Sequence, residues 1–287
     1  MADITAVVLT KNEEKNLPDC LRSLEGFARR VLVVDSGSTD ATVEIARAAG
    51  ADVLTHPFET HGRQFNWALD HGNIQTAWTL RLDADERLTP AAREELEALM
   101  AEHARDDVNG IVMMAWLYFM GRKLSHVKRM KRKLMVFKTG VGRSEDRNID
   151  EHTVLLRGRT VEAKERYLHY DYKDMNHYIA KLNWYAGREV RDYFAHLEGT
   201  DQAVTLEAVN QGKRNKKFGL YYRLPMFLRC KLLFFYSYVL RGGFLDGREG
   251  FLYHYMYHCW YRMVVDAKIL EHQRAGTPFE PLDSLKS

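Results

Sequence analysis

The chain has 287 residues, of which 46% are hydrophobic and 28% charged, with 6 prolines and 3 cysteines. This composition supports a sizeable buried core and excludes disordered and low-complexity proteins, and three scattered cysteines favour neither a disulfide framework nor a zinc site. The net charge of +3 hides an asymmetry, because residues 1–110 carry 11 basic and 20 acidic side chains, whereas residues 111–287 carry 31 and 19. The two parts are therefore expected to bind different kinds of group.

Short β-branched and aliphatic runs alternate with helical patterns in the first 80 residues. Strands are expected at 4–9, 31–34, 53–54 and 78–80. Helices are expected at 41–49, ended by Gly50, and at about 62–71. This alternation predicts a βαβ sheet, in which ligands bind beyond the carboxyl ends of the strands.

Acidic clusters follow three of these strands. They are TKNEE at 10–14, DSGS at 35–38 and DADE at 83–86. The glycine-rich turns of dinucleotide-binding and P-loop proteins are missing, which disfavours a dehydrogenase and a P-loop nucleotidase. An acidic edge repels a bare phosphate unless a divalent cation intervenes, and Asp83 and Asp85 suit such a hard cation. On its own this triplet is more often a solvated turn.

Four ordered segments closely resemble family 2 glycosyltransferases of the GT-A fold. They are VVLTKNE at 7–13, VVDSGSTD at 33–40, GRQFNWAL at 62–69 and LDADE at 82–86. Later segments are similar to the lipopolysaccharide-core glucosyltransferase branch: IDEH at 149–152, LHY at 168–170, HYIAKLNWY at 177–185 and RGGFLDG at 241–247. The resemblance implies an α/β GT-A fold, a mainly parallel sheet flanked by helices, and inverting transfer of a sugar from a nucleotide diphosphate to an acceptor hydroxyl.

The same resemblance implies a set of donor-side residues. The donor-binding residues are Thr10, Asn12, Glu13, Asp35, Arg63 and Asp83. Asp83 would lie near the ribose and the metal, and Asp85 would bind the metal, Mg²⁺ or Mn²⁺, directly. His169 is a candidate further metal ligand, with a structural histidine as the equal alternative. Asn66 is expected to form local hydrogen bonds, and UDP is the nucleotide that the family favours.

An inverting single displacement needs one general base on the acceptor side. Glu151 is the first candidate, because the matching family motif usually reads Val-His-Glu. This chain departs from the motif at Asp150, which is therefore a second candidate, and Asp146, within a Glu-Asp pair, is a third. A carboxyl group near other carboxylates can have a raised pKa, which suits a base.

Two segments of residues 111–287 are unusual in composition, one in basic and the other in aromatic side chains. Residues 122–133 contain seven basic side chains in twelve, which would meet acceptor phosphates or lipid headgroups, or else form a solvated loop. Residues 221–261 hold 14 of the 33 aromatic residues, and a helix is expected from Pro225 through Leu240. This composition predicts contact with an anionic membrane surface, or alternatively with the catalytic domain or across a homodimer. The apolar run at 232–240 is too short to span a bilayer.

The sequence thus predicts a donor half at 1–110, an acceptor half with the base at 111–210, and a C-terminal helical, aromatic-rich element at 211–287. The expected enzyme is cytoplasmic, without a signal peptide, peripheral on the inner face of the cytoplasmic membrane, and acts on a lipid-linked or lipopolysaccharide-type glycan. A sugar-nucleotide pyrophosphorylase is disfavoured, because it would need a glycine- and arginine-rich first turn. The other alternative is a non-catalytic basic module that binds membranes or nucleic acid, although carboxylate-rich strand ends argue against nucleic acid.

Overall fold

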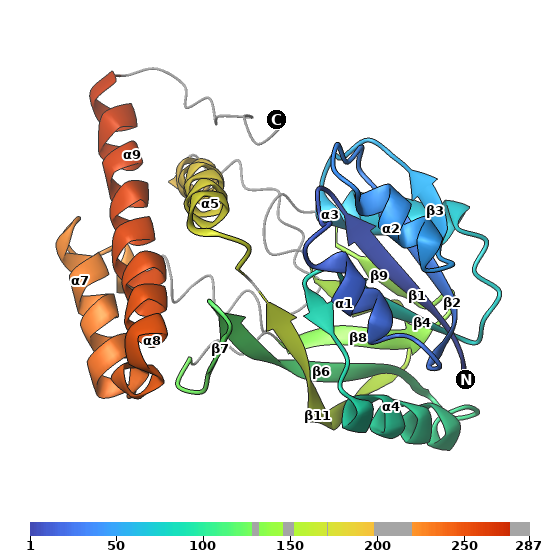
Figure 1. The fold of residues 1–287 in the computed structure, drawn as a ribbon. Helices are drawn as coiled ribbons and strands as arrows, with labels where there is room; N and C mark the ends of the chain where they lie inside the picture. Colours follow the sequence, from blue (N-terminus) through green and yellow to red (C-terminus); the bar gives the residue numbers. More distant parts are fainter. Residues whose placement is uncertain (128–131, 146–151, 171, 198–219, 276–287) are drawn as a thin grey trace. The chain divides into compact units, whose positions relative to one another are not determined.

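The computed structural model of the protein describes residues 1–127, 132–145, 152–170, 172–197 and 220–275 (Figure 1). The chain forms two compact units. Unit 1 comprises Met1–Tyr118 and Arg129–Asp171, and unit 2 comprises Phe119–Lys128 and Tyr172–Ser287. The chain therefore passes from unit 1 to unit 2 and back before it enters unit 2 for the second time.

Unit 1 is built on a mixed sheet with the strand order β3-β2-β1-β4-β8-β6-β11-β5. The strands are β1 (Ala2–Thr10), β2 (Ala28–Asp35), β3 (Asp52–Thr55), β4 (Trp78–Asp83), β5 (Glu86–Arg87), β6 (Val108–Phe119), β8 (Arg132–Lys138) and β11 (Arg159–Tyr170). The first four pair in parallel, as do β6 and β11, whereas β8 runs antiparallel between β4 and β6. A short strand β7 (Arg122–Leu124) pairs with β6, and β9 (Gly142–Ser144) forms a separate hairpin with β10 (Thr153–Leu155).

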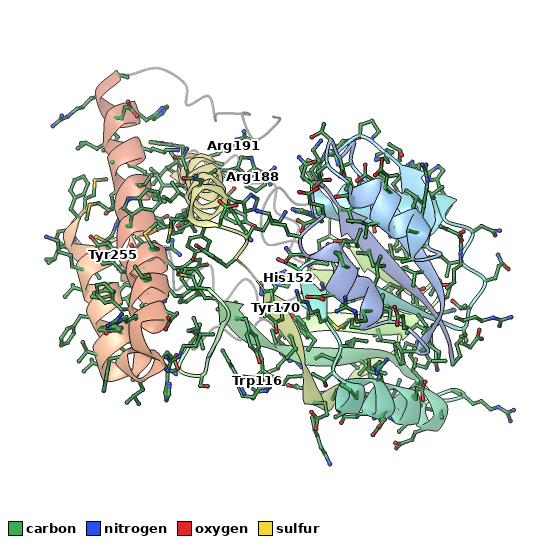
Figure 2. The ribbon with its side chains drawn as sticks, viewed as in Figure 1. Trp116, His152, Tyr170, Arg188, Arg191 and Tyr255 are labelled. Carbon is green, nitrogen blue, oxygen red and sulfur yellow. The ribbon has the colours of Figure 1, made fainter. Side chains whose placement is uncertain are left out.

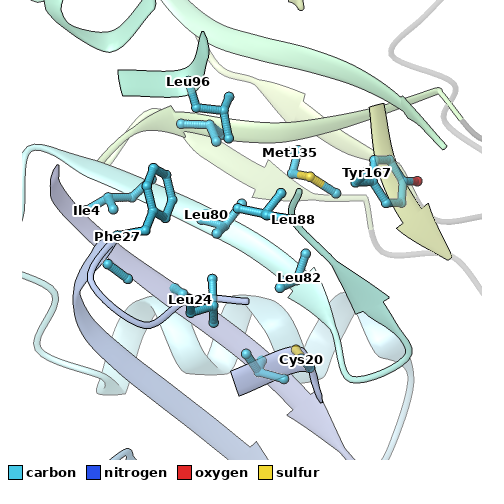
Figure 3. Packing of buried hydrophobic residues seen from close by; sticks show 14 of the residues in the cluster. Ile4, Cys20, Leu24, Phe27, Leu80, Leu82, Leu88, Leu96, Met135 and Tyr167 are labelled. Atoms are coloured by element: carbon cyan, nitrogen blue, oxygen red, sulfur yellow. The ribbon is translucent and has the colours of Figure 1, made fainter. Parts of the chain in front are cut away.

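Two apolar clusters cover the two faces of this sheet. The larger one joins alternate strand residues such as Ile4 and Leu80 to Cys20 of α1 (Leu17–Arg22) and Leu96 of α4 (Pro90–Glu102) (Figure 3). The other cluster contains Val7 of β1 together with helix α3 (His61–His71). Because successive side chains of a strand point to opposite faces, β1 is buried on both sides, as parallel strands between helices are.

The predicted α/β class, a mainly parallel sheet flanked by helices, is confirmed. Helix α2 (Thr42–Ala48) is followed by Ala49 and then Gly50, whose φ of +76° lies in the left-handed region that glycine adopts without strain. Helix α3 begins after Thr60, whose side chain accepts a hydrogen bond from the backbone N–H of Arg63.

Unit 2 is helical in its described parts. Its elements include α5 (Met175–Leu197), α7 (Leu228–Phe235), a π-helical turn (Tyr236–Leu240), a 3₁₀ turn (Gly243–Asp246), α8 (Gly247–His254), a second π-helical turn (Tyr255–Trp260) and α9 (Tyr261–Ala275). Helix α5 packs against α9. Within the described ranges, no helix is both long enough and apolar enough to cross a bilayer.

The predicted start of the C-terminal helix at Pro225 is wrong, because α7 begins at Leu228. Phe227 has a left-handed φ of +62°, and its N–H donates to Asp266 Oδ2 at 2.8 Å. Asp266 lies far along the chain, in α9, so this tertiary hydrogen bond overrides the local helix-start signal.

Two buried ion pairs hold unit 2 together. Arg229 of α7 pairs with Asp266 of α9, and both side chains are 1% exposed. Arg262 of α9 pairs with Glu189 of α5, which also accepts a hydrogen bond from the hydroxyl of Tyr222 at 2.8 Å. Removing one member of such a pair leaves a buried charge without compensation.

Replacing Arg229 by Met should therefore lower the free energy of unfolding by about 3–5 kcal/mol. Urea denaturation followed by circular dichroism measures this loss. The double variant Arg229→Met/Asp266→Leu should recover part of the stability, and Arg22→Ala, which removes an exposed pair with Asp19, serves as the control. A double variant no more stable than Arg229→Met would contradict this explanation.

Candidate active site

Strand β1 brings two of the predicted site residues together at the carboxyl edge of the sheet. Thr10 pairs with Asp35 in the parallel register of β1 and β2, and the Thr10 hydroxyl donates to Asp35 Oδ1 at 3.0 Å. The other oxygen, Oδ2, accepts the backbone N–H groups of Gly37 and Ser38, each at 2.8 Å, and the Ser38 hydroxyl donates to Oδ1. Asp35 thus shapes the turn that follows β2. Its carboxylate can accept about four hydrogen bonds, and it accepts four here. A nucleobase N–H would have to displace one of these donors.

The loop after β1 is fastened to the loop after β2. Asn12 adopts a left-handed φ of +53°, its N–H donates to Ser38 Oγ at 2.8 Å, and its Oδ1 accepts the N–H of Thr39 at 2.8 Å. The N–H of Glu13 donates to Thr42 Oγ1 at 2.7 Å. The structure therefore brings Thr10, Asn12, Glu13 and Asp35 together, as the sequence predicts.

Arg63 lies beside this region, in the first turn of α3. Its guanidinium is half exposed and pairs with Glu59 at 2.9 Å. The adjacent Gln64 is buried, and its side-chain amide donates to Ser36 Oγ at 3.1 Å and to the His56 carbonyl at 3.0 Å. Gln64 therefore ties the start of α3 to the turn after β2 and leaves Arg63 next to that turn.

Arg63 also lines a hollow of about 280 Å³ along the exposed side of α3. The other lining residues are His56, Glu59, Asn66, Trp67, Asp70 and His71. The ring of Trp67 is stacked on both His56 and His71, at centroid distances of 4.4 and 4.6 Å. The hollow is therefore lined by a stack of three aromatic rings.

The Asp-x-Asp turn follows β4 and is held by charged neighbours. Asp83 Oδ2 accepts a hydrogen bond from Lys133 Nζ at 3.0 Å, and Glu86 Oε2 accepts one from the same ammonium at 2.6 Å. Glu86 Oε2 also accepts the backbone N–H of Asp83 at 2.9 Å. Burial favours protonation of Asp83, but Lys133 and Arg81 outweigh it and hold the pKa of this carboxyl well below its ordinary value. Burial, followed by the charge of Asp83, raises the pKa of Glu86.

Asp85 lies against the end of β11. Its carbonyl accepts the N–H of Tyr170 at 2.8 Å, and its Oδ2 lies 3.3 Å from Nε2 of the buried His169. Because His169 pairs with Glu86 in the register of β11 and β5, the predicted residues Asp83, Asp85 and His169 share one region of the sheet edge.

These residues fit a divalent cation in part. Asp85 and His169 offer two adjacent ligand atoms, whereas Asp83 Oδ2 faces an ammonium. Among the described residues, no group of three or more His, Cys, Asp or Glu side chains is arranged to hold a metal ion. Mg²⁺ commonly binds to one or two carboxylates and completes its shell with water and substrate phosphate oxygens, so the pair suits a cation that arrives with a nucleotide.

The three candidate bases, Glu151, Asp150 and Asp146, lie outside the described residues. The hairpin that flanks them is firmly attached. The Glu145 N–H donates to the His152 carbonyl at 2.9 Å. The side-chain amide of Asn66 both donates to and accepts from the backbone of Ser144 at 2.9 Å, so these hydrogen bonds join residues 78 apart in the sequence.

Arg81 of β4 ties the same hairpin to the sheet. Its Nη1 donates to Ser144 Oγ at 3.2 Å and to Thr153 Oγ1 at 2.8 Å, so both strands of the hairpin are held. Arg81 therefore fixes the β9–β10 hairpin, which flanks the candidate bases, to β4, the strand that ends at Asp83.

An aromatic pair occupies the ends of β6 and β11. Tyr118 and Tyr170 are stacked at 4.5 Å, and the guanidinium of Arg87 lies 3.8 Å from the Tyr170 ring centre. Tyr170 and Trp116 are labelled in Figure 2. Farther back on the same strands, Arg166 lies 4.0 Å from the ring centre of Trp116. Flat aromatic and cationic groups thus line the sheet next to Asp85.

Sequence reasoning missed four side chains that build this site: Gln64, Arg81, Glu86 and Lys133. Glu86 is part of the DADE motif, so the sequence predicts that it lies in the acidic cluster. The sequence does not predict its hydrogen bond to the backbone N–H of Asp83. Lys133 was assigned to the basic run at 122–133 that would meet acceptor phosphates. That assignment is wrong for Lys133, whose side chain is 14% exposed and paired with Asp83 and Glu86.

Several known proteins are similar to this chain. The model of "Glycosyl transferase family 2" matches residues 5–163, more than half of the chain. The lipopolysaccharide core biosynthesis glycosyltransferase LpsC of Rhizobium meliloti is 29% identical over 265 residues, covering 88% of this chain and 89% of LpsC. An uncharacterized glycosyltransferase of Rickettsia typhi is 24% identical over 261 residues, covering 88% of this chain and 82% of that protein.

The structure of S. aureus TarS residues 1–349 with UDP-GlcNAc is 15% identical, with a TM-score of 0.45 over 98% of this chain and 93% of that one. The chain belongs to glycosyl transferase family 2 and is a glycosyltransferase of the GT-A fold.

Proposed function

We propose that this glycosyltransferase moves a sugar, with inversion, from a nucleotide diphosphate donor to a hydroxyl of a lipid-linked or lipopolysaccharide-type glycan. One observation carries the donor assignment: the turns after β1, β2 and β4 meet where the sheet order reverses. Such a switch point forms a crevice for ligands in open α/β sheets. The name of the Rhizobium meliloti relative supports the acceptor class.

The donor-side roles follow from this placement. Thr10, Asn12, Glu13, Asp35 and Arg63 would hold the nucleoside, and Asp83 would meet the ribose. Because the N–H groups of Gly37 and Ser38 already bond to Asp35, the turn is shaped before any nucleotide arrives. A preformed site loses less entropy on binding, which favours affinity. UDP is the nucleotide we propose first.

Mg²⁺ or Mn²⁺ would bind at Asp85, with His169 as a further candidate ligand. When bound, such a cation screens the diphosphate and stabilises the charge that develops on the leaving group. Asp85 is anchored through the bond between its carbonyl and the Tyr170 N–H, so its carboxylate is held at the sheet edge.

Glu151 is the proposed general base, with Asp150 and Asp146 as alternatives. The base would accept the proton of the acceptor hydroxyl as its oxygen attacks the sugar carbon. Arg81 and Asn66 fix the hairpin that flanks this segment, which applies to all three candidates alike.

We further propose that unit 2 places the enzyme on the cytoplasmic face of the membrane. Large apolar side chains are exposed along α7, α8 and their connections: Leu224, Phe227, Leu228, Leu232, Phe235, Tyr236, Val239, Leu240, Phe244, Leu245, Phe251 and Tyr255. Residues 220–245 contain no Asp or Glu, and they contain Arg223, Lys231 and Arg241 besides the buried Arg229, whereas α8 carries Arg248 and Glu249. An apolar surface whose charged neighbours are mostly cationic suits an anionic leaflet. A subunit interface is the competing explanation.

Asp85→Ala should weaken metal-dependent nucleotide binding at least about tenfold, which corresponds to about 1.4 kcal/mol. Thermal shift with UDP, GDP, CMP and dTDP sugars, with and without Mn²⁺, identifies the nucleotide, and calorimetry then gives the affinity. Asp52→Ala, which removes an exposed carboxylate at the start of β3, is the matched control. If Asp85→Ala bound the nucleotide and Mn²⁺ as tightly as the control, the metal assignment would be wrong.

Glu151→Gln should keep donor affinity within about twofold but slow sugar transfer by about 10²–10⁴-fold, because the amide cannot accept the proton. Single-turnover transfer at saturating donor measures the chemical step. Asp150→Asn and Asp146→Asn are measured beside it. If Glu151→Gln retained near-normal turnover and one of these variants lost it, that residue would be the base.

Leu232→Glu/Phe235→Glu should abolish flotation with vesicles that contain anionic lipid, because it places two charges on the apolar face. Leu156→Glu alters an exposed leucine of unit 1 and is expected to leave flotation unchanged. If the unchanged protein failed to float and formed dimers that the double substitution dissociated, the face would be a subunit interface instead.

A further inference from the structure

The ammonium of Lys133 occupies one side of the Asp-x-Asp turn. Strand β8 runs antiparallel to β4, with Trp78 opposite Lys138 and Leu80 opposite Val136. The pairing of β4 with β8 ends at Leu80 and Val136, and β8 continues from there to Lys133. The Lys133 side chain is 14% exposed, and its Nζ lies 3.0 Å from Asp83 Oδ2 at the end of β4.

Glu86 anchors this ammonium. Its side chain is 1% exposed, and Oε2 accepts both Lys133 Nζ at 2.6 Å and the backbone N–H of Asp83 at 2.9 Å. A buried ammonium between two carboxylates is held by charge-assisted hydrogen bonds, which are stronger than neutral ones. Lys133 is consequently fixed next to Asp83, whereas Asp85 Oδ2 lies 3.3 Å from His169 Nε2.

This arrangement gives the two aspartates different environments. A divalent cation at Asp83 Oδ2 would meet the positive charge of Lys133 at close range, where like charges repel strongly in a partly buried site. The hydrogen bond from Lys133 uses Oδ2, so Oδ1 is the oxygen of Asp83 that would accept a hydroxyl hydrogen bond.

We infer that Lys133, anchored by Glu86, is a positioning residue that keeps divalent cations off Asp83, so that Asp83 serves the nucleotide and Asp85 serves the metal. The inference rests on the proposed function, because it assigns different roles to Asp83 and Asp85 within the donor site. It gives Glu86 a role as well, since Glu86 holds both the ammonium and the backbone of the turn.

Mn²⁺ binding without nucleotide tests this role directly. Electron paramagnetic resonance of free Mn²⁺ should show that Lys133→Met binds the ion at least tenfold more tightly than the unchanged protein, because Asp83 and Asp85 can then chelate it together. A gain of affinity cannot arise from simple loss of structure. Lys133→Arg, which keeps the charge, should return the affinity to within threefold of the unchanged protein.

The double variant Lys133→Met/Glu86→Gln is the control for misfolding. It removes both charges of the Lys133–Glu86 pair, so neither charge is left without its partner. It should show the same gain in Mn²⁺ affinity. If Mn²⁺ affinity stayed the same or fell in the folded double variant, the positioning role of Lys133 would be refuted. If instead none of UDP, GDP, CMP and dTDP bound to the unchanged protein, the proposed donor function would fail, whatever the Mn²⁺ result.

Discussion

Strand β1 pairs in parallel with β2 on one side and β4 on the other, and the geometry of the site depends on this pairing. The register sets Thr10 beside Asp35 and Leu9 beside Asp83, so the turns after all three strands reach the same edge. Burial of β1 on both faces fixes that register, because a slip by one residue would exchange the side chains of the two apolar clusters. The core thus determines where the polar residues lie.

Several carboxylates of the acidic edge have hydrogen-bond donors or a cation beside them. Backbone N–H groups and hydroxyls surround Asp35, Lys133 pairs with Asp83 and Glu86, and His169 lies next to Asp85. Part of the negative charge of residues 1–110 is therefore balanced by Lys133 of β8. The charge asymmetry of the sequence reflects a single sheet to which both parts contribute.

Local patterns were sufficient to predict β1 to β4, α2, α3 and the grouping of Thr10, Asn12, Glu13 and Asp35, whereas α1, α4 and β5 were not predicted. Long-range contacts were not predictable in this way. Lys133 meets Asp83 only because β8 inserts antiparallel between β4 and β6, and no spacing in the sequence encodes that insertion. The start of α7 at Leu228 likewise depends on Asp266, a distant residue whose buried pair with Arg229 competes with the local signal of Pro225.

Hydrogen–deuterium exchange with and without nucleotide and Mn²⁺ tests the central claim most directly, because it reports on each turn separately. The account predicts that UDP, or another of GDP, CMP and dTDP, slows exchange at residues 10–13, 35–38 and 83–86 together, with no comparable change in α9. Protection confined to unit 2, or absent from these three turns with every nucleotide, would contradict the account.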